Sequence, residues 1–194
     1  MQESRSVGMK LVILDRDGVI NQDSVNFIKN PNEWIPLSGS LDAIALLNQS
    51  GFRVAVATNQ SGVSRGLFDM AMLNSIHEKM NRELAIVGGR IDAIFYCPHA
   101  ADEHCHCRKP ETGMIEEIGK RFAMELINVP AVGDALRDLQ AFAASGCQPI
   151  LVLTGKGKTT LAASKQSSEK ALPANTWVCK DLAEAVQRII AVQD

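Results

Sequence analysis

Short apolar runs alternate with amphipathic stretches along most of the chain. Runs of four to six mainly apolar residues that stop at glycine or polar residues are typical of buried parallel strands. They predict strands at residues 10–14, 52–57, 91–96, 128–132, 149–153 and 176–179. Apolar residues at helical spacing predict helices at residues 40–50, 69–87, 111–126, 136–145 and 181–192. Strands that alternate with helices indicate an α/β fold with a parallel, doubly wound sheet.

Polar and glycine residues mark several of the predicted helix ends. Ser40, Asp69 and Asp181 can cap helix starts, and Gly51 stands where a helix often stops. Residues 155–175 are rich in Gly, Lys, Ser and Thr, which predicts a mobile loop and a short helix.

Three features invite functional interpretations that we set aside. The run Gly155-Lys156-Gly157-Lys158-Thr159 resembles part of a nucleotide-binding P-loop, but that pattern needs a glycine where Val152 stands. We interpret it as a basic surface loop. His77 falls at helix spacing on a polar face, which predicts a surface histidine. Cys147 and Cys179 are expected to be ordinary buried or half-buried thiols.

Length and composition limit the class of protein. The chain has 194 residues, which suits a single domain at residues 9–192 after an N-terminal extension at residues 1–8. The net charge of -2 argues against broad nucleic-acid binding, which usually shows a basic surplus. No run approaches the ~18 apolar residues of a membrane span, and the extension lacks the apolar stretch of a signal peptide. We expect a soluble, cytoplasmic and monomeric protein with no membrane or nucleic-acid partner.

Polar clusters follow four of the predicted strands. Three come directly after a strand and one follows across a loop: Asp15 and Asp17, Thr58 and Asn59, Asp134 and Asp138, and, after the loop, Arg108 and Lys109. In an open α/β sheet, ligands bind at the carboxyl ends of the strands. Each pair alone would be a turn, a cap or solvated surface, but four at successive strand ends favour one shared site.

These residue types suit phosphoryl transfer. The Asp15 carboxylate can attack phosphorus to form an aspartyl-phosphate, and Asp17 can protonate the leaving oxygen and then activate water. Hard oxygen ligands such as Asp15 and Asp134 suit Mg²⁺, which would offset the repulsion between carboxylates and an anionic substrate. Lys109 and the Thr58 hydroxyl can bind the remaining phosphoryl oxygens.

The same residues resemble the four motifs of the haloacid dehalogenase superfamily. The resemblance covers about residues 9–153 and rests on Asp15-x-Asp17-Gly18-Val19, Thr58-Asn59, Lys109 and Gly133-Asp134-x3-Asp138. It implies a Rossmann-like fold, Asp15 as nucleophile and Asp17 as general acid and base. It also implies Mg²⁺ held by Asp15, Asp134 and the Asp17 backbone carbonyl. Asp138 would be a supporting acid, and the aspartate at position 17 is similar to the phosphatase branch. Only about 40 residues separate the first two clusters, so we expect no large cap domain.

Cysteine and histidine gather in the loop before Arg108. Three of the five cysteines, Cys97, Cys105 and Cys107, lie within eleven residues, which is unlike a secreted disulfide framework. Three thiolates and one imidazole would make a closed Zn²⁺ site of the structural type. Such a zinc-binding loop would fix the backbone that carries Lys109 without joining the chemistry.

Three histidines compete for the fourth position in this cluster. We favour His99, because Cys97-x-His99 then mirrors Cys105-x-Cys107 across the loop. His104 and His106 remain competing ligands.

The zinc loop narrows the resemblance to two related families of zinc-bearing phosphatases. Cys97-Pro98-His99 with Cys105-x-Cys107-Arg108-Lys109-Pro110 is similar to the heptose 1,7-bisphosphate phosphatases and the histidinol-phosphatases. The short gap between His99 and Cys105 is similar to the histidinol enzymes. The runs Gln60-Ser61 and Arg65-Gly66-Leu67-Phe68 are similar to the heptose enzymes instead. The latter resemblance implies removal of the 7-phosphate of the sugar bisphosphate, in ADP- or GDP-heptose and lipopolysaccharide core synthesis.

The resemblance also implies a set of substrate contacts. They are Asp23, Asn26, Thr58, Asn59, Gln60, Ser61, Arg65, Arg108 and Lys109. The planar fork of Arg108 can pair with the distal phosphate. Two alternatives stay open: hydrolysis of histidinol phosphate, and a non-catalytic zinc module that binds nucleic acid or protein. The net charge of -2 and the lack of a basic, aromatic surface disfavour the second.

Overall fold

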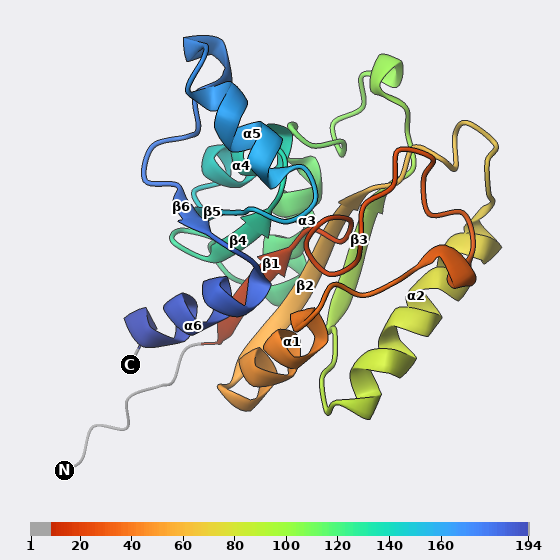
Figure 1. Cartoon of the computed structure of the whole chain (residues 1–194), viewed down its shortest axis with the longest axis horizontal. Coiled ribbons are helices and arrows are strands. Elements are labelled where there is room, and N and C mark those ends of the chain that lie inside the picture. Colours follow the sequence, from red (N-terminus) through yellow and green to blue (C-terminus); the bar gives the residue numbers. More distant parts are fainter. Residues whose placement is uncertain (1–8, 194) are drawn as a thin grey trace.

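The computed structural model describes residues 9–193, and these contain one six-stranded parallel sheet. The strands are β1 (Lys10–Leu14), β2 (Phe52–Asn59), β3 (Ala93–Cys97), β4 (Pro130–Gly133), β5 (Gln148–Val152) and β6 (Trp177–Cys179). Their order in the sheet is β3-β2-β1-β4-β5-β6 (Figure 1). The predicted doubly wound, Rossmann-like sheet is confirmed, while the predicted extension at residues 1–8 lies outside the described residues.

Helices cover both faces of the sheet (Figure 1). They are α1 (Ser40–Gln49), α2 (Met70–Ile86), α3 (Gly113–Phe122), α4 (Leu136–Ala144), α5 (Gly157–Ser164) and α6 (Leu182–Gln193), with short 3-10 turns at Pro31–Glu33, Ala101–Glu103 and Ser168–Lys170. Buried residues of α1, α2 and α6 pack on one face, and those of α3 and α4 pack on the other. Among the described residues, no helix has the length and apolar character that crossing a bilayer requires.

The central strand β1 shows how the sequence builds these two layers. Val12 and Leu14 belong to the core under α1, α2 and α6, whereas Leu11 and Ile13 belong to the core under α3 and α4. Successive side chains of a strand point to opposite faces, so a strand that is buried on both faces must be apolar at every position.

The direction of the chain connections reverses between β1 and β4, which are neighbours in the sheet. The backbone N–H of Asp15, just after β1, donates to the carbonyl of Val132 in β4 at 2.8 Å. A crevice opens at such a switch point, because the loops after the two strands leave toward opposite faces. The fold therefore brings Asp15 and Asp134 to the same point.

Two helix ends differ from the sequence-based expectation. Ser40 is the first residue of α1 and not its cap, because Gly39 takes the cap position and the Ser40 hydroxyl donates to the carbonyls of Ile20 and Leu37. The third helix stops at Phe122, because Ala123 adopts a left-handed φ of 51°. The predicted cap of α2 is confirmed, with the Asp69 carboxylate accepting from the Met72 N–H at 2.8 Å.

Candidate active site

Asp15, Lys109 and Asp138 form a buried charge cluster at the carboxyl end of the sheet. Lys109 Nζ lies 2.9 Å from Asp15 Oδ1 and 2.8 Å from Asp138 Oδ1, and it donates to the Ala57 carbonyl at 2.7 Å. Burial alone would lower the pKa of Lys109, but the charges of Asp138 and Asp15 outweigh it and raise that pKa. Lys109 is therefore a fixed positive charge beside Asp15.

The two carboxylates that share Lys109 differ in their proton affinity. Burial raises the pKa of Asp15 to about 6, against the opposing charge of Lys109. Burial also acts on Asp138, but the charges of Lys109 and Arg137 outweigh it and lower the pKa of Asp138. Asp138 is consequently the permanent anionic partner of Lys109, which fits a supporting role.

Asp134 completes a group of three acids with Asp15 and Asp138. One carboxylate oxygen from each lies within 4.8 Å of the others. Burial, followed by the charges of Asp15 and Asp138, raises the pKa of Asp134 to about 8. Buried carboxylates this close repel one another unless a proton or a cation intervenes. Hard oxygen donors at this spacing fit Mg²⁺.

Two glycines allow the backbone to approach Asp134 closely. Gly18 has a φ of 85° and Gly155 a φ of 51°. An added Cβ atom would lie 2.1 Å from Asp134 Oδ2 at Gly18 and 2.2 Å from the same oxygen at Gly155. The Lys156 N–H donates to the same oxygen at 2.7 Å, and the Thr154 hydroxyl joins the two segments by donating to the Gly18 carbonyl at 2.6 Å. Glycine at both positions is therefore a condition for the observed position of Asp134.

The carboxylate of Asp17 is held by three side chains. Arg16 Nη2 donates to both of its oxygens at 2.9 Å, Asn21 Nδ2 donates to Oδ1 at 2.9 Å, and Gln60 Nε2 donates to Oδ2 at 2.9 Å. Burial alone would raise the pKa of Asp17, but the charge of Arg16 and the bonds from Asn21 and Gln60 outweigh it and lower that pKa. In the free protein Asp17 is thus an oriented carboxylate.

Asn59, the last residue of β2, clamps the backbone of Lys109. Its Nδ2 donates to the Lys109 carbonyl at 3.0 Å, and its Oδ1 accepts from the Lys109 N–H at 3.2 Å. The neighbouring Gln60 donates to the Thr58 hydroxyl oxygen at 2.8 Å. The side-chain amide of Asn59 is thus engaged with the protein, and a substrate contact by this residue stays a prediction.

A pocket of about 400 Å³ opens onto these groups. Its lining includes most of the predicted site residues: Asp15, Asp17, Asp23, Thr58, Asn59, Gln60, Ser61, Arg65, Arg108, Lys109 and Asp138. Asp134 lies buried beside Asp15. Asn26 is exposed and lies outside the lining set.

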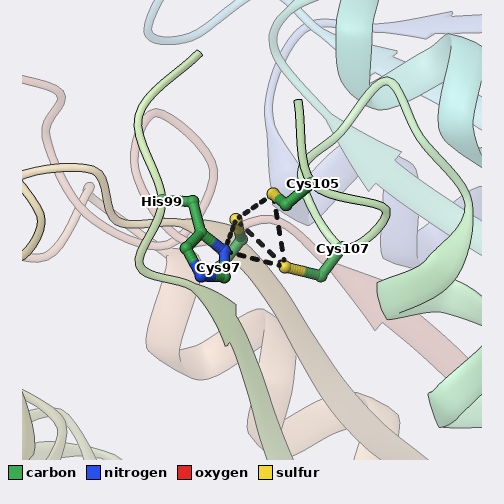
Figure 2. A group of neighbouring side chains, drawn as sticks. All are labelled: Cys97, His99, Cys105 and Cys107. Atoms are coloured by element: carbon green, nitrogen blue, oxygen red, sulfur yellow. Dashed lines mark hydrogen bonds between the residues drawn. The ribbon is translucent and has the colours of Figure 1, made fainter. Parts of the chain in front are cut away.

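The cysteine loop forms a second cluster, which begins at the end of β3 (Figure 2). Cys97 Sγ lies 3.5 Å from the sulfur of Cys105 and 3.3 Å from that of Cys107. His99 Nδ1 lies 3.3 Å from Cys107 Sγ and 3.6 Å from Cys97 Sγ. A tetrahedral zinc ion with Zn–S bonds of about 2.3 Å requires ligand separations of roughly 3.5–3.8 Å. Three sulfurs and one imidazole nitrogen at these distances fit such an ion.

The two competing histidines do not join this cluster. His106 Nε2 lies 3.3 Å from a carboxylate oxygen of Glu116, and His104 is exposed. Arg108 connects the cluster with the pocket, because its Nη1 donates to the His99 carbonyl at 3.0 Å while the side chain lines the pocket.

Comparisons with known proteins agree with this geometry. The HAD-hydrolase-like family model matches residues 106–185. The D-glycero-beta-D-manno-heptose-1,7-bisphosphate 7-phosphatase of Bordetella bronchiseptica is 57% identical over 94% of this chain and 98% of its own length. The chain belongs to this phosphatase family. The predicted membership of the haloacid dehalogenase superfamily is confirmed.

Further members of the heptose bisphosphate phosphatase family support the assignment. The enzyme of Pseudomonas aeruginosa is 47% identical over 93% of this chain and 97% of its own length. The crystal structure of the B. bronchiseptica D,D-heptose 1,7-bisphosphate phosphatase, complexed with magnesium and phosphate, superposes with a TM-score of 0.90. That structure is 56% identical and covers 95% of this chain and 99% of its own.

The prediction from the sequence was wrong for one buried residue of this phosphatase, His77, and assigned no role to another, Arg16. The prediction of a surface position for His77 is wrong, since only 7% of the residue is exposed. His77 lies on the same stripe of α2 as Leu73, Ile76 and Met80, and that periodicity could have located it. Arg16 is fully buried and contacts both Asp17 and His77. No sequence pattern signals that an arginine is buried.

The predicted basic surface loop at residues 155–159 is only partly correct. Gly155 and Lys156 are exposed, but residues 157–159 form the first turn of α5 and Gly157 is buried. The exposed part also contacts the site. Lys156 Nζ pairs with Asp23 Oδ2 at 2.6 Å, while its backbone N–H binds Asp134. Lys156 and Arg137, to which sequence reasoning gave no role, both line the pocket. The site is thus bordered by the segment after β5 as well as by the cysteine loop.

Proposed function

We propose that this phosphatase hydrolyses the 7-phosphate ester of D-glycero-β-D-manno-heptose 1,7-bisphosphate. The observation that carries the proposal is the buried arrangement of Asp15, Lys109 and Asp134 at the base of a pocket, in a chain that is 57% identical to the Bordetella enzyme. The name of that relative specifies the substrate, including its β anomer.

Asp15 would act as the nucleophile in the first step. One of its carboxylate oxygens attacks phosphorus, the bond between phosphorus and the sugar oxygen breaks, and an aspartyl-phosphate forms on Asp15. Lys109 Nζ, 2.9 Å from Asp15 Oδ1, supplies positive charge where the phosphoryl oxygens gather negative charge. The Thr58 hydroxyl, on the pocket wall, offers a further donor.

Asp17 would transfer the protons. It gives one to the departing sugar oxygen, and in the second step it takes one from the water that attacks the aspartyl-phosphate. That attack releases inorganic phosphate and restores Asp15. The pKa of Asp17 lies below its ordinary value in the free protein, which suits the second step. A phosphoryl group beside Asp17 adds negative charge and raises that pKa, which suits the first step.

The two metal clusters would have different roles. Asp15, Asp134 and the Asp17 backbone carbonyl would hold Mg²⁺, which offsets the mutual repulsion of the acids and the substrate phosphate. Cys97, His99, Cys105 and Cys107 would hold Zn²⁺, which stabilises the loop that leads into Lys109.

The distal phosphate has two candidate partners at the pocket wall. Arg65 and Arg108 both line the pocket, and neither belongs to the buried charge cluster around Asp15. Guanidinium groups can bind phosphate through two parallel hydrogen bonds. A bisphosphate would therefore place one phosphate on Asp15 and Lys109 and the other at these arginines.

Assays of the purified protein with two substrates test this proposal. We expect the kcat/KM for heptose 1,7-bisphosphate to exceed that for histidinol phosphate by at least about a hundredfold, because a site built for two phosphates leaves charged groups unpaired with one. A higher kcat/KM on histidinol phosphate would overturn the choice of substrate. Absence of turnover on both, with zinc bound, would favour the non-catalytic zinc module.

A further inference from the structure

His77 and Arg16 form a buried pair that the mechanism above does not use. Arg16 Nη1 lies 3.2 Å from His77 Nε2, and the two residues are 0% and 7% exposed. Arg16 follows β1 beside the reacting carboxylates, whereas His77 lies in the middle of α2. The contact thus joins a helix on one face of the sheet to the loop that carries Asp15 and Asp17.

The chemistry of the pair determines which nitrogen of His77 carries the proton. A guanidinium group donates hydrogen bonds and accepts none, so Nε2 must be the acceptor and the ring proton lies on Nδ1. The ring is then neutral. Burial, followed by the charge of Arg16, lowers the pKa of His77 to about 4, in agreement with this assignment.

The planar guanidinium group of Arg16 donates to two partners, Asp17 along one edge and His77 along another. Its Nε and Nη2 donate to Asp17 at 3.1 Å and 2.9 Å, and its Nη1 is directed at His77. Because the guanidinium group is planar, an acceptor that fixes Nη1 also fixes the direction of the other two donors. A buried guanidinium that lost this acceptor would turn toward another one, and the carboxylate of Asp17 would lose the only one of its three partners that binds both of its oxygens.

We propose that His77 is a positioning residue for catalysis, which acts through Arg16 to hold the Asp17 carboxylate toward the reacting phosphoryl group. The proposal rests on the proposed function, since it assumes that Asp17 exchanges protons with the sugar oxygen and with water. His77 itself lies outside the lining of the pocket and outside both candidate metal clusters.

Two substitutions at His77 and one elsewhere on α2 separate positioning from packing. His77→Leu keeps an apolar volume but removes the acceptor, whereas the amide oxygen of His77→Gln can stand near the position of Nε2. Leu84→Ala is the control, because Leu84 is buried on the same stripe of α2 and its side chain has no polar group. Each variant is assayed for kcat, KM and the Mg²⁺ concentration that gives half-maximal activity.

We expect His77→Leu to lower kcat by about 10- to 100-fold, the usual cost of removing a residue that orients a reacting group. KM and the half-maximal Mg²⁺ concentration should change less than about threefold, because binding groups are untouched. His77→Gln should restore kcat to within about threefold of wild type. Leu84→Ala should lower the melting temperature with little change in kcat.

Three results would overturn the proposal. They are an unchanged kcat in folded His77→Leu, an equal loss of kcat in His77→Gln and His77→Leu, and a loss of kcat in Leu84→Ala as large as that in His77→Leu. If wild-type protein releases no phosphate from the heptose bisphosphate, the proposed function fails separately. The same kinetic comparison is then made on p-nitrophenyl phosphate.

A spectroscopic measurement tests the pair without any substrate. In protein labelled with 15N at its four histidines, the His77 resonances are assigned by their loss in His77→Gln. We expect the chemical shifts and couplings of a neutral ring with its proton on Nδ1 at neutral pH. A proton on Nε2 would contradict the hydrogen bond to Arg16 and with it the positioning role.

Discussion

The acidic centre around Asp15 and the cysteine cluster after β3 are built in different ways. The acidic centre offsets part of its charge with a protein group, since Lys109 lies between Asp15 and Asp138, and both carboxylates are almost fully buried. The cysteine cluster contains no positively charged partner for its thiols, and Cys105 and Cys107 are only partly buried. The first is held together by the sheet, whereas the second depends on the ion that its ligands would share.

Lys109 belongs to both regions. Its side chain is fixed by the acidic centre and its backbone by Asn59 on β2, while the chain just before it carries the cysteine cluster. Damage to the acidic centre should therefore remove the chemistry at once. Damage to the cysteine cluster should reach the chemistry only through the position of Lys109, and its effect should be smaller.

The largest effect is expected from Asp15→Asn, which removes the proposed nucleophile but retains the shape of the side chain. We expect kcat/KM to fall by at least about a thousandfold, because an amide cannot form the aspartyl-phosphate. Lys109 keeps Asp138 as its partner, so circular dichroism and zinc content should match wild type. The exposed Asp42→Asn is the matched control and should retain full activity. Full activity of Asp15→Asn would remove the central claim of the mechanism.

Gly155→Ala should disturb the acidic centre, because Gly155 packs closely against Asp134. The new Cβ would lie 2.2 Å from Asp134 Oδ2, so the carboxylate or the loop must move. We expect the Mg²⁺ concentration for half-maximal activity to rise by about 10- to 100-fold, since ligand orientation governs metal affinity.

Gly51→Ala separates the clash with Asp134 from backbone strain. Gly51 also has a positive φ, 83°, but an added Cβ there would meet no atom within 4 Å. It should lose some stability and keep its response to Mg²⁺. Equal Mg²⁺ responses in the Gly51 and Gly155 variants would contradict the assigned place of Asp134.

Cys107→Ser should disrupt the cysteine cluster. Wild-type protein is expected to hold about one zinc per chain, and the variant should lose it because a closed tetrahedral site needs all four ligands. We expect kcat to fall by only about tenfold, since Asn59 still clamps Lys109 from the sheet. Elemental analysis and kinetics measure the two effects. The control is Cys147→Ala, which changes a buried thiol outside the cluster and should retain zinc. Wild-type protein that contains no zinc would refute the ligand assignment.

The same contrast explains what the sequence could and could not predict. Asp15, Asp134 and Cys97 follow short apolar runs, so their strand-end positions could be inferred from local pattern and the topology of parallel sheets. The buried pair of Arg16 and His77 could not. It depends on a contact between segments 61 residues apart, and burial of a charge is decided by partners that only the folded chain brings together.

The smallest expected effect is a change in stability with pH. This change reports on the carboxylates of the acidic centre. The pKa values of Asp15, about 6, and Asp134, about 8, lie above the ordinary value of 3.8, so the metal-free folded protein binds protons there more tightly than the unfolded chain does. Their contribution to stability is present below about pH 4 and is lost as the pH rises to about 8. Mg²⁺ held by the ionised carboxylates, as proposed, should reverse that loss. The rise in melting temperature on adding Mg²⁺ should therefore be a few degrees at pH 8.5 and close to zero at pH 5.5.

Taking the difference with and without Mg²⁺ removes the effect of other titrating groups. The pKa of His77, lowered to about 4, changes stability in the opposite sense, since the unfolded chain then binds the proton more tightly and stability falls as the pH drops from 6.5 toward 4. That contribution is the same with and without the metal, so it cancels. Asp134→Asn should abolish the pH-dependent difference, whereas Cys107→Ser should keep it, because the cysteine cluster takes no part in holding Mg²⁺. A loss of the difference in Cys107→Ser would mean that the two regions are not independent.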